Sequence, residues 1–239
     1  MKIKCLFLFN ALLFFLVLVC SLFLNRKLDS TLVSANYKIP TTVILDAGHG
    51  GFDGGAVAKD GTLEKDINLS ITMRLKDLFL LGGYNVVMIR EQDMGLDTNS
   101  DESIGKRKIS DMKKRLEIVN SNQDSIFISI HQNKFDSDIV RGAQVFHSPN
   151  ECGSDLLADC IQKSFASRLQ KDNNRIVKKA NKNIYLLYNA NIPSVIVECG
   201  FLSNTKELAL LKNDEYQKKV SFTIYCGFLE YLKKDEVLK

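Results

Sequence analysis

TVILDAGHGGFDGG, residues Thr42–Gly55, is the stretch from which the architecture of the chain can be inferred. It opens as a short apolar run, which predicts a buried strand, and continues after Asp46 into a loop with five glycines and His49. A buried strand that delivers a histidine into a glycine-rich loop is typical of sites at the carboxyl edge of an α/β sheet. This indication is weak alone, and it gains weight if other strands end in residues able to share a ligand with His49.

Two later strands are predicted to end in such residues. Ser125–Asn133 (SIFISIHQN) is an apolar run that reaches His131 near its end, and Ser194–Glu198 (SVIVE) ends in a carboxylate. Carboxyl ends of parallel strands meet at one edge of a sheet, so these side chains are expected to lie near His49. The other predicted strands are Tyr84–Arg90, Ala143–Ser148 and Asn183–Tyr188.

Helices are predicted between the strands, because apolar residues recur there at three- and four-residue spacing. Their expected ranges are Thr62–Gly83, Ile104–Asn120, Cys152–Leu169, Thr205–Leu211 and Glu215–Lys233. Strands that alternate with helices predict one α/β domain with a twisted, mainly parallel sheet of about six strands, flanked by helices. An N-terminal apolar helix is expected to precede this domain.

Several side chains have predicted places on these helices. Glu64 falls in the first turn of its helix, where the helix dipole favours an ionised carboxylate. Glu207 is at the position that closes a capping box with Asn204. Ile109 is assigned to the apolar stripe of Ile104–Asn120. The basic cluster of that helix is taken as a solvated face: Lys106, Arg107, Lys113 and Lys114. His147 lacks a glycine-rich context and is taken as structural.

Composition excludes several classes of function. A formal net charge of +4 is too small to argue for nucleic acid binding. No C-x-x-C pair is present, so a cysteine zinc site is not expected. Cys152 and Cys160 would lie roughly 12 Å apart along a helix, too far for a disulfide. These two cysteines, with Cys199 and Cys226, are expected to be buried small hydrophobes.

The N-terminus is expected to be a membrane anchor or signal segment over residues 1–27. Its apolar run, Cys5–Leu24, is about 30 Å long as a helix, enough to cross a bilayer. An uncleaved anchor fits better than a secretory signal, whose apolar region would be shorter. A polar tether over residues 28–40 and a catalytic domain over residues 41–234 follow. The domain is thus expected to lie outside the cytoplasm, either anchored or secreted.

Four side chains form the candidate site: His49, Glu64, His131 and Glu198. Two neutral imidazoles and one carboxylate make a hydrolytic zinc set that leaves a position open for water. The remaining carboxylate can then serve as general base. Spacing alone leaves open which of Glu64 and Glu198 is the ligand. It also leaves open a simpler interpretation, in which these are two loop histidines and two ordinary acids.

Four separated motifs resemble one family in order and spacing: VILDAGHGGFDGGAV, LEKDINLSI, SIFISIHQN and VIVECGFLSNTKELALL. The chain resembles the zinc-dependent N-acetylmuramoyl-L-alanine amidases of the Amidase_3 family over about Thr41–Leu232. The resemblance implies one Zn²⁺ per chain, bound by His49, Glu64 and His131, with Glu198 as the catalytic carboxylate. It also implies hydrolysis of the amide between N-acetylmuramic acid and L-alanine in peptidoglycan.

The resemblance is closer still to the spore-cortex amidases of endospore formers, through features such as the basic stretch Gly105–Arg115. It implies cortex peptidoglycan as substrate, a step towards muramic-δ-lactam, and a location between the forespore membranes. An accessory sporulation protein and the membrane are the other expected partners. Two roles are predicted from sequence position: Asp46 hydrogen-bonds one of the histidines, and Arg115 reaches the substrate. The alternatives are a zinc peptidase acting within the stem peptide and a non-catalytic cell-wall binding module.

Overall fold

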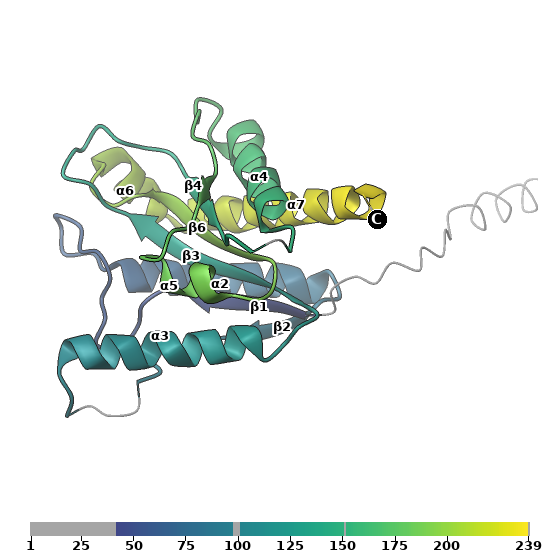
Figure 1. Cartoon of the computed structure of the whole chain (residues 1–239). Helices are drawn as coiled ribbons and strands as arrows, with labels where there is room; N and C mark the ends of the chain where they lie inside the picture. Colours follow the sequence, from purple (N-terminus) through teal and green to yellow (C-terminus); the bar gives the residue numbers. More distant parts are fainter. Residues whose placement is uncertain (1–41, 98–100, 151, 239) are drawn as a thin grey trace, which may run out of the picture. The chain divides into compact units, whose positions relative to one another are not determined.

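Six strands form one sheet in the order β2-β1-β3-β6-β4-β5 in the computed structural model, which describes residues 42–97, 101–150 and 152–238 (Figure 1). The strands are β1 (Thr42–Ala47), β2 (Asn85–Met88), β3 (Ser125–Asn133), β4 (Gln144–His147), β5 (Lys178–Lys179) and β6 (Ser194–Phe201). β2, β1, β3 and β6 are parallel, whereas β4 runs antiparallel to β6. The predicted fold class, a mainly parallel sheet of about six strands, is confirmed.

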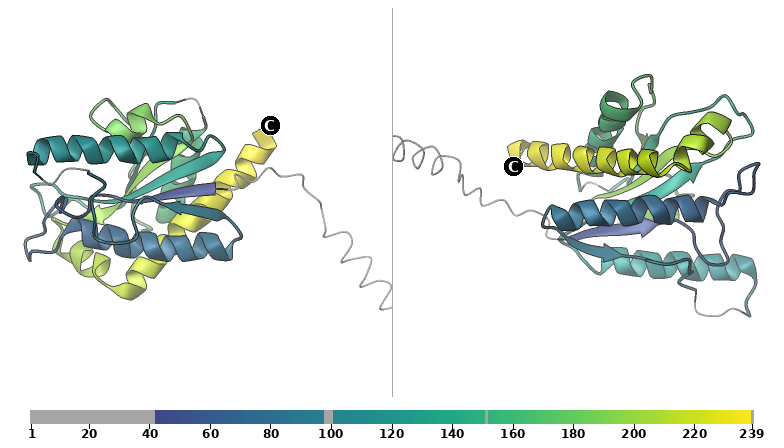
Figure 2. Two further views of the ribbon diagram at one scale, coloured as in Figure 1. Left: turned by 90° about the horizontal axis from the view of Figure 1, so that it is seen from below. Right: turned by 180° about the vertical axis from the view of Figure 1, so that it is seen from behind.

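Helices cover both faces of the sheet (Figure 2). One face carries α2 (Glu64–Leu81), α4 (Ser154–Ser164) and the long α7 (Asp214–Leu238), which packs against both of the others. A π-helical turn, η1 (Phe165–Leu169), extends α4, and the short helix α6 (Thr205–Leu211) follows β6. The opposite face carries α3 (Ile104–Asn120) and α5 (Tyr185–Asn189). Because both faces are covered, the central strands are apolar along nearly their whole length.

The core beneath α3 shows how the pattern of β1 and β3 positions the site. Ile44, Phe127 and Ile196 come from three neighbouring strands and are buried in one cluster with Val119 of α3. Each such side chain contributes about 1.5–3 kcal/mol by its removal from water. Side chains alternate along a strand, so the residues two and four places after Ile44, Phe127 and Ile196 lie on the same face of the sheet. They approach the carboxyl edge of the sheet, where the candidate site lies.

The predicted strand at Asn183–Tyr188 is wrong, because Tyr185–Asn189 forms the helix α5. Leu186 and Leu187 are both buried, whereas Tyr185 and Tyr188 are 36% and 40% exposed. Two adjacent buried residues between exposed ones suit a helical turn, since neighbouring residues of a strand face opposite sides. The outer strand forms earlier in the chain, at Lys178–Lys179 beside β4.

Three smaller predictions also fail. Ile109 is 58% exposed, because the buried face of α3 follows Asp111, Arg115 and Val119 instead. Asn204 caps α6 as predicted, accepting from the backbone of Glu207 at 3.1 Å. The Glu207 carboxylate, however, accepts from the backbone of Gly142 and Phe201 rather than closing the box. Of the four cysteines expected to be buried, Cys152 is exposed and Cys226 is intermediate.

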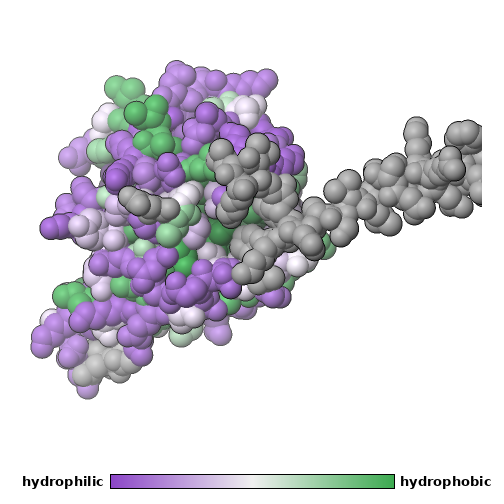
Figure 3. All heavy atoms as spheres, turned by 45° about the vertical axis from the view of Figure 1, so that its right-hand side comes forward, coloured by the Kyte–Doolittle hydropathy of each residue, from purple (hydrophilic) through white to green (hydrophobic). Residues whose placement is uncertain are grey.

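The predicted N-terminal anchor and tether lie outside the described residues. Within residues 42–97, 101–150 and 152–238, the helices are too short or too polar to span a bilayer. The face drawn in Figure 3 is mainly hydrophilic and carries its apolar side chains in small groups, the usual surface of a folded domain.

Candidate metal centre

The loop after β1 has a backbone that only a glycine-rich sequence readily adopts. Gly50, Gly51 and Gly55 have φ angles of 133°, 55° and 68°. Gly48 is needed for a different reason: a Cβ atom there would lie 2.2 Å from the ring of His131. The glycines therefore let this loop turn sharply and let a histidine from β3 approach its backbone.

β3 and β6 bring the second histidine beside the candidate general base. His131 is paired with Glu198 in the parallel register of these strands, and paired residues project from the same face. His131 lies near the carboxyl end of β3, whereas β6 continues to Phe201, beyond its predicted end at Glu198. Gln144 of the antiparallel β4 is paired with Glu198 on its other side.

Glu64 is the first residue of α2, and three hydrogen bonds fix its buried carboxylate. The backbone N–H of Ala56 donates to Oε2 at 2.8 Å, and that of Gln132 donates to Oε1 at 3.0 Å. The side chain of Asn68, one turn along the helix, donates to Oε1 at 3.2 Å. Burial raises the pKa of Glu64, but hydrogen bonds with His131 and His49 outweigh it and hold that pKa below its usual value.

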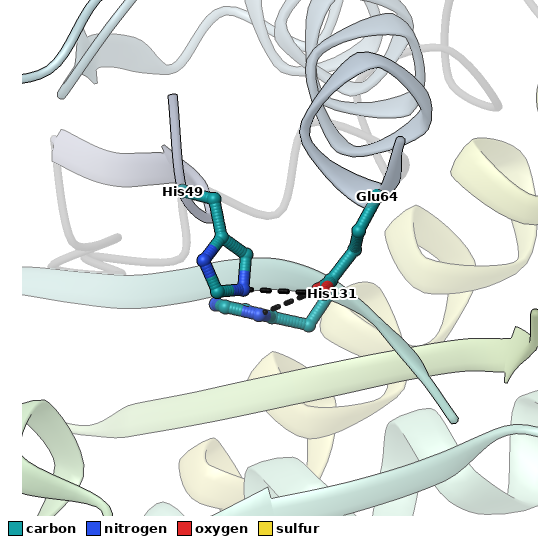
Figure 4. A group of neighbouring side chains, drawn as sticks. All are labelled: His49, Glu64 and His131. Carbon is teal, nitrogen blue, oxygen red and sulfur yellow. Dashed lines mark hydrogen bonds and ion pairs between the residues drawn. The ribbon is translucent and has the colours of Figure 1, made fainter. Parts of the chain in front are cut away.

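The two histidines converge on this carboxylate (Figure 4). His49 Nε2 lies 3.2 Å from Glu64 Oε2, and His131 Nδ1 lies 3.0 Å from Glu64 Oε1. One ligand atom from each of the three residues lies within 4.8 Å of the others. Two imidazole nitrogens and one carboxylate oxygen suit a divalent metal of the zinc type. The donor set therefore fits a metal ion, and these three residues could hold one.

The protonation of His49 opposes metal binding at neutral pH. Burial lowers the pKa of His49, but its hydrogen bonds and charge interactions with Asp53 and Glu64 outweigh burial and raise the pKa to about 9. A metal ligand must be a neutral imidazole, so a bound ion has to displace this proton.

Asp53, which sequence analysis missed, is the carboxylate that holds a candidate ligand. Its Oδ2 lies 2.8 Å from His49 Nδ1, so it fixes the ring with Nε2 towards Glu64. A carboxylate behind a metal-binding histidine is a common arrangement, because it sets the tautomer and the ring orientation. The sequence signal is the four-residue spacing of His49 and Asp53 across a tight turn, closed by a backbone bridge from Gly50 to Asp53.

The role predicted for Asp46 is wrong: it bonds Arg115 and Ser129 rather than a histidine. Asp46 faces α3 because it is two residues beyond Ile44 on the same side of β1. The role predicted for Arg115 is also wrong. Its side chain is 2% exposed and donates to Asp46, to Asp111 and to the backbone carbonyl of His49, so it supports the loop from inside.

Glu198 has the environment of an acid–base group. Its Oε2 is buried and has no hydrogen-bond partner among the described residues. Burial, with a smaller contribution from the charge of Glu64, raises the pKa of Glu198 to about 7. A carboxyl group with a pKa near neutral can both accept and return a proton.

His147 lies outside the candidate site, and its Nδ1 donates to the carbonyl of Ser148 at 2.9 Å, in agreement with the structural role predicted for it.

Comparisons with known proteins identify the family of this chain. Residues 43–230 match the family model Amidase_3, described as N-acetylmuramoyl-L-alanine amidase. The germination-specific N-acetylmuramoyl-L-alanine amidase of Bacillus subtilis is 36% identical over 191 residues, which are 79% of this chain and 78% of the relative. The amidase LytC of the same organism is 30% identical and matches 87% of this chain, but only 40% of its own length.

Two solved structures share the fold and much of the sequence. The CwlD amidase of Clostridioides difficile, solved in complex with the GerS lipoprotein, has a TM-score of 0.78 and 43% identity, covering 81% of this chain and 98% of that one. The amidase AmiC2 of Nostoc punctiforme has a TM-score of 0.70 and 28% identity, with coverage of 82% and 98%. From its family match and its relatives, the chain belongs to the Amidase_3 family of N-acetylmuramoyl-L-alanine amidases.

Proposed function

We propose that His49, Glu64 and His131 hold one Zn²⁺ ion in a chain that hydrolyses the amide between N-acetylmuramic acid and L-alanine. The observation that carries this proposal is the convergence of two imidazoles on the Glu64 carboxylate, beside Glu198, in an Amidase_3 domain. When bound, zinc would polarise the carbonyl of the substrate amide and lower the pKa of a bound water molecule towards about 7.

In this proposal Glu198 accepts a proton from water and later donates it. Its carboxylate accepts the proton of the attacking water, because a pKa of about 7 leaves it largely ionised just above neutral pH. The carboxyl group then donates that proton to the nitrogen of L-alanine as the amide bond breaks, and the peptide leaves with a free amino terminus. Glu198 is suited to both steps because its Oε2 has no hydrogen-bond partner among the described residues.

The ligand residues have a supporting role. Asp53 keeps His49 Nε2 directed at the centre, and the backbone of Ala56 and Gln132 keeps both oxygens of Glu64 in place. Such fixed ligands lose little freedom when a metal binds, which favours a single geometry.

The biological role that we propose is the processing of spore-cortex peptidoglycan as a step towards muramic-δ-lactam. It is supported by the similarity to a germination-specific amidase and to CwlD. We further propose an extracytoplasmic location, with residues 1–27 as anchor or signal, 28–40 as tether and 41–234 as the catalytic domain. The complex of CwlD with a lipoprotein supports a similar accessory partner for this chain.

Product analysis tests the reaction. Purified peptidoglycan is digested with the zinc-loaded full-length chain, and the fragments are identified by mass spectrometry. The proposed amidase releases peptides with a free L-alanine amino terminus and leaves a lactyl carboxylate on the muramic acid. Cleavage within the stem peptide would support a peptidase instead, and intact peptidoglycan would support a non-catalytic binding module.

Muropeptides from spores that lack the protein test the cortex role separately. We expect muramic-δ-lactam to be absent from such spores. An unchanged content would contradict the cortex role and leave the amidase reaction standing.

A further inference from the structure

One side of helix α3 lies against the loop that carries His49. The guanidinium of Arg107 lies 3.9 Å from the ring centroid of Phe52, and Lys108 Nζ lies 2.9 Å from Asp53 Oδ1. Two turns further along, Arg115 donates to the backbone carbonyl of His49 in the same loop. Arg107, one of the four basic residues taken as a solvated face, therefore packs on this loop, and its neighbour Lys108 is paired with Asp53.

Asp53 connects this helix to the candidate ligand. Its two carboxylate oxygens have different partners: Oδ2 is bonded to His49 Nδ1 at 2.8 Å, and Oδ1 is bonded to Lys108 and to the backbone of Gly55 at 3.3 Å. Rotation of the carboxylate would break contacts at both oxygens at once.

We propose that Lys108 is a positioning residue for the metal centre: it fixes Asp53, which in turn fixes the ring of His49. This inference rests on the metal site proposed above and assigns a role to α3, a helix that supplies none of the proposed ligands. Lys108 acts through two contacts in series, Lys108 to Asp53 and Asp53 to His49. Its loss frees one oxygen of Asp53 and loosens the orientation of Nε2.

A competing interpretation is that Lys108 makes an ordinary surface ion pair. Its side chain is 51% exposed, and isolated pairs of this kind contribute about 0–1 kcal/mol to stability. The two interpretations differ in what they predict. A surface pair affects neither metal affinity nor the stability of the metal-free protein appreciably, whereas a positioning residue affects metal affinity alone.

The test measures zinc affinity of the full-length chain by competition with a chromophoric chelator. Lys108→Met is expected to weaken zinc binding about three- to tenfold, less than the roughly 10- to 100-fold typical of groups directly behind metal ligands, because it acts through Asp53. Lys113→Met removes the same charge from an exposed site on the same helix and should change the affinity less than about twofold. Lys108→Arg keeps the charge and should restore binding to within about twofold of the unsubstituted chain.

Asp53→Asn tests the second contact and should weaken zinc binding more, by about 10- to 100-fold. The melting temperature of each metal-free variant is measured in parallel. Weaker zinc binding by Lys108→Met, with an unchanged melting temperature and rescue by Lys108→Arg, supports the proposal.

Three results with the variants would overturn it: equal zinc affinities for Lys108→Met and Lys113→Met, a failure of Lys108→Arg to rescue, or a loss of affinity that merely follows a lower melting temperature. Hydrolysis of peptidoglycan by the unsubstituted chain is assayed separately. Tight zinc binding without hydrolysis would contradict the amidase reaction and leave the role of Lys108 intact. A chain that binds no zinc would overturn both.

Discussion

Arg115 Nη2 donates a hydrogen bond to the backbone carbonyl of His49 at 2.7 Å. His49 has a φ angle of 63°, a left-handed conformation that a residue with a side chain adopts at a cost of roughly 1–3 kcal/mol. The same guanidinium is paired with Asp46 and Asp111 beneath the loop. A buried arginine thus holds the strained backbone of a candidate metal ligand.

Arg115→Met is expected to destabilise the protein by about 3–5 kcal/mol, because Asp46 would be left buried and without its counter-charge. The free energy of unfolding is measured by denaturant titration of the metal-free chain. Arg74→Met is the matched control, since Arg74 is paired with the exposed Asp214 and its loss should cost about 1 kcal/mol or less. Equal losses for both variants would contradict the supporting role of Arg115.

Gly48→Ala is expected to abolish tight metal binding. The added Cβ would lie 2.2 Å from Cε1 and Nε2 of His131, so the ring has to move away from Glu64. Gly105→Ala in α3 is the control, because its Cβ meets nothing within 4 Å and alanine favours a helix by up to about 1 kcal/mol. Zinc titration of both variants checks this, and an unaffected Gly48→Ala protein would exclude the described contact between β3 and the loop.

Zinc affinity is expected to rise with pH. The pKa of His49 is raised to about 9 in the metal-free protein, so zinc binding releases one proton below that pH, and the affinity gains up to about tenfold per pH unit. The stability of the metal-free protein depends on pH in the opposite direction. The raised pKa contributes stability to the metal-free fold fully below about 6.5, and this contribution is lost as the pH rises through about 9. Calorimetric titrations in two buffers of different ionisation enthalpy measure the released proton, and a pH-independent affinity would contradict the assignment.

Glu198→Gln is expected to abolish hydrolysis and to stabilise the metal-free protein. The pKa of Glu198 is raised to about 7, so its ionisation opposes folding increasingly from pH 4.5 to 7 and fully above. Glutamine removes that charge, and each 1 kcal/mol gained should raise the melting temperature by about 2–4 °C. Thermal unfolding at pH 8 and pH 4 checks this: the gain should be present at pH 8 and absent at pH 4. Retained hydrolysis in the folded, zinc-loaded variant would exclude Glu198 as the proton carrier.

The sequence predicted the sheet and three of its polar strand ends because each depends on a local pattern. His131 and Glu198 follow the apolar parts of two neighbouring strands, and the parallel register of these strands is enough to bring them together. The contacts of Asp53 and Arg115 could not be predicted in this way. They depend on the path of a loop with several left-handed residues and on where α3 packs, which periodicity does not determine.

The helix α5 illustrates the same limit. Its apolar run is too short to separate strand from helix, and packing of Leu186 and Leu187 against the α3 side of the sheet decides the outcome. Family resemblance, by contrast, distinguished Glu64 from Glu198 where spacing could not, and that assignment stays a prediction. Glu64 faces both histidines, whereas Glu198 stands beside them with a free oxygen.

Zinc content per chain tests the central claim most directly. The metal is quantified in the purified full-length protein and in His49→Ala, His131→Ala and His147→Ala, so that each histidine of the chain is removed once. We predict one zinc per chain in the unsubstituted protein and in His147→Ala, and well below one in the other two variants. Full zinc content in His49→Ala and His131→Ala, or an equal loss in His147→Ala, would contradict the site described here.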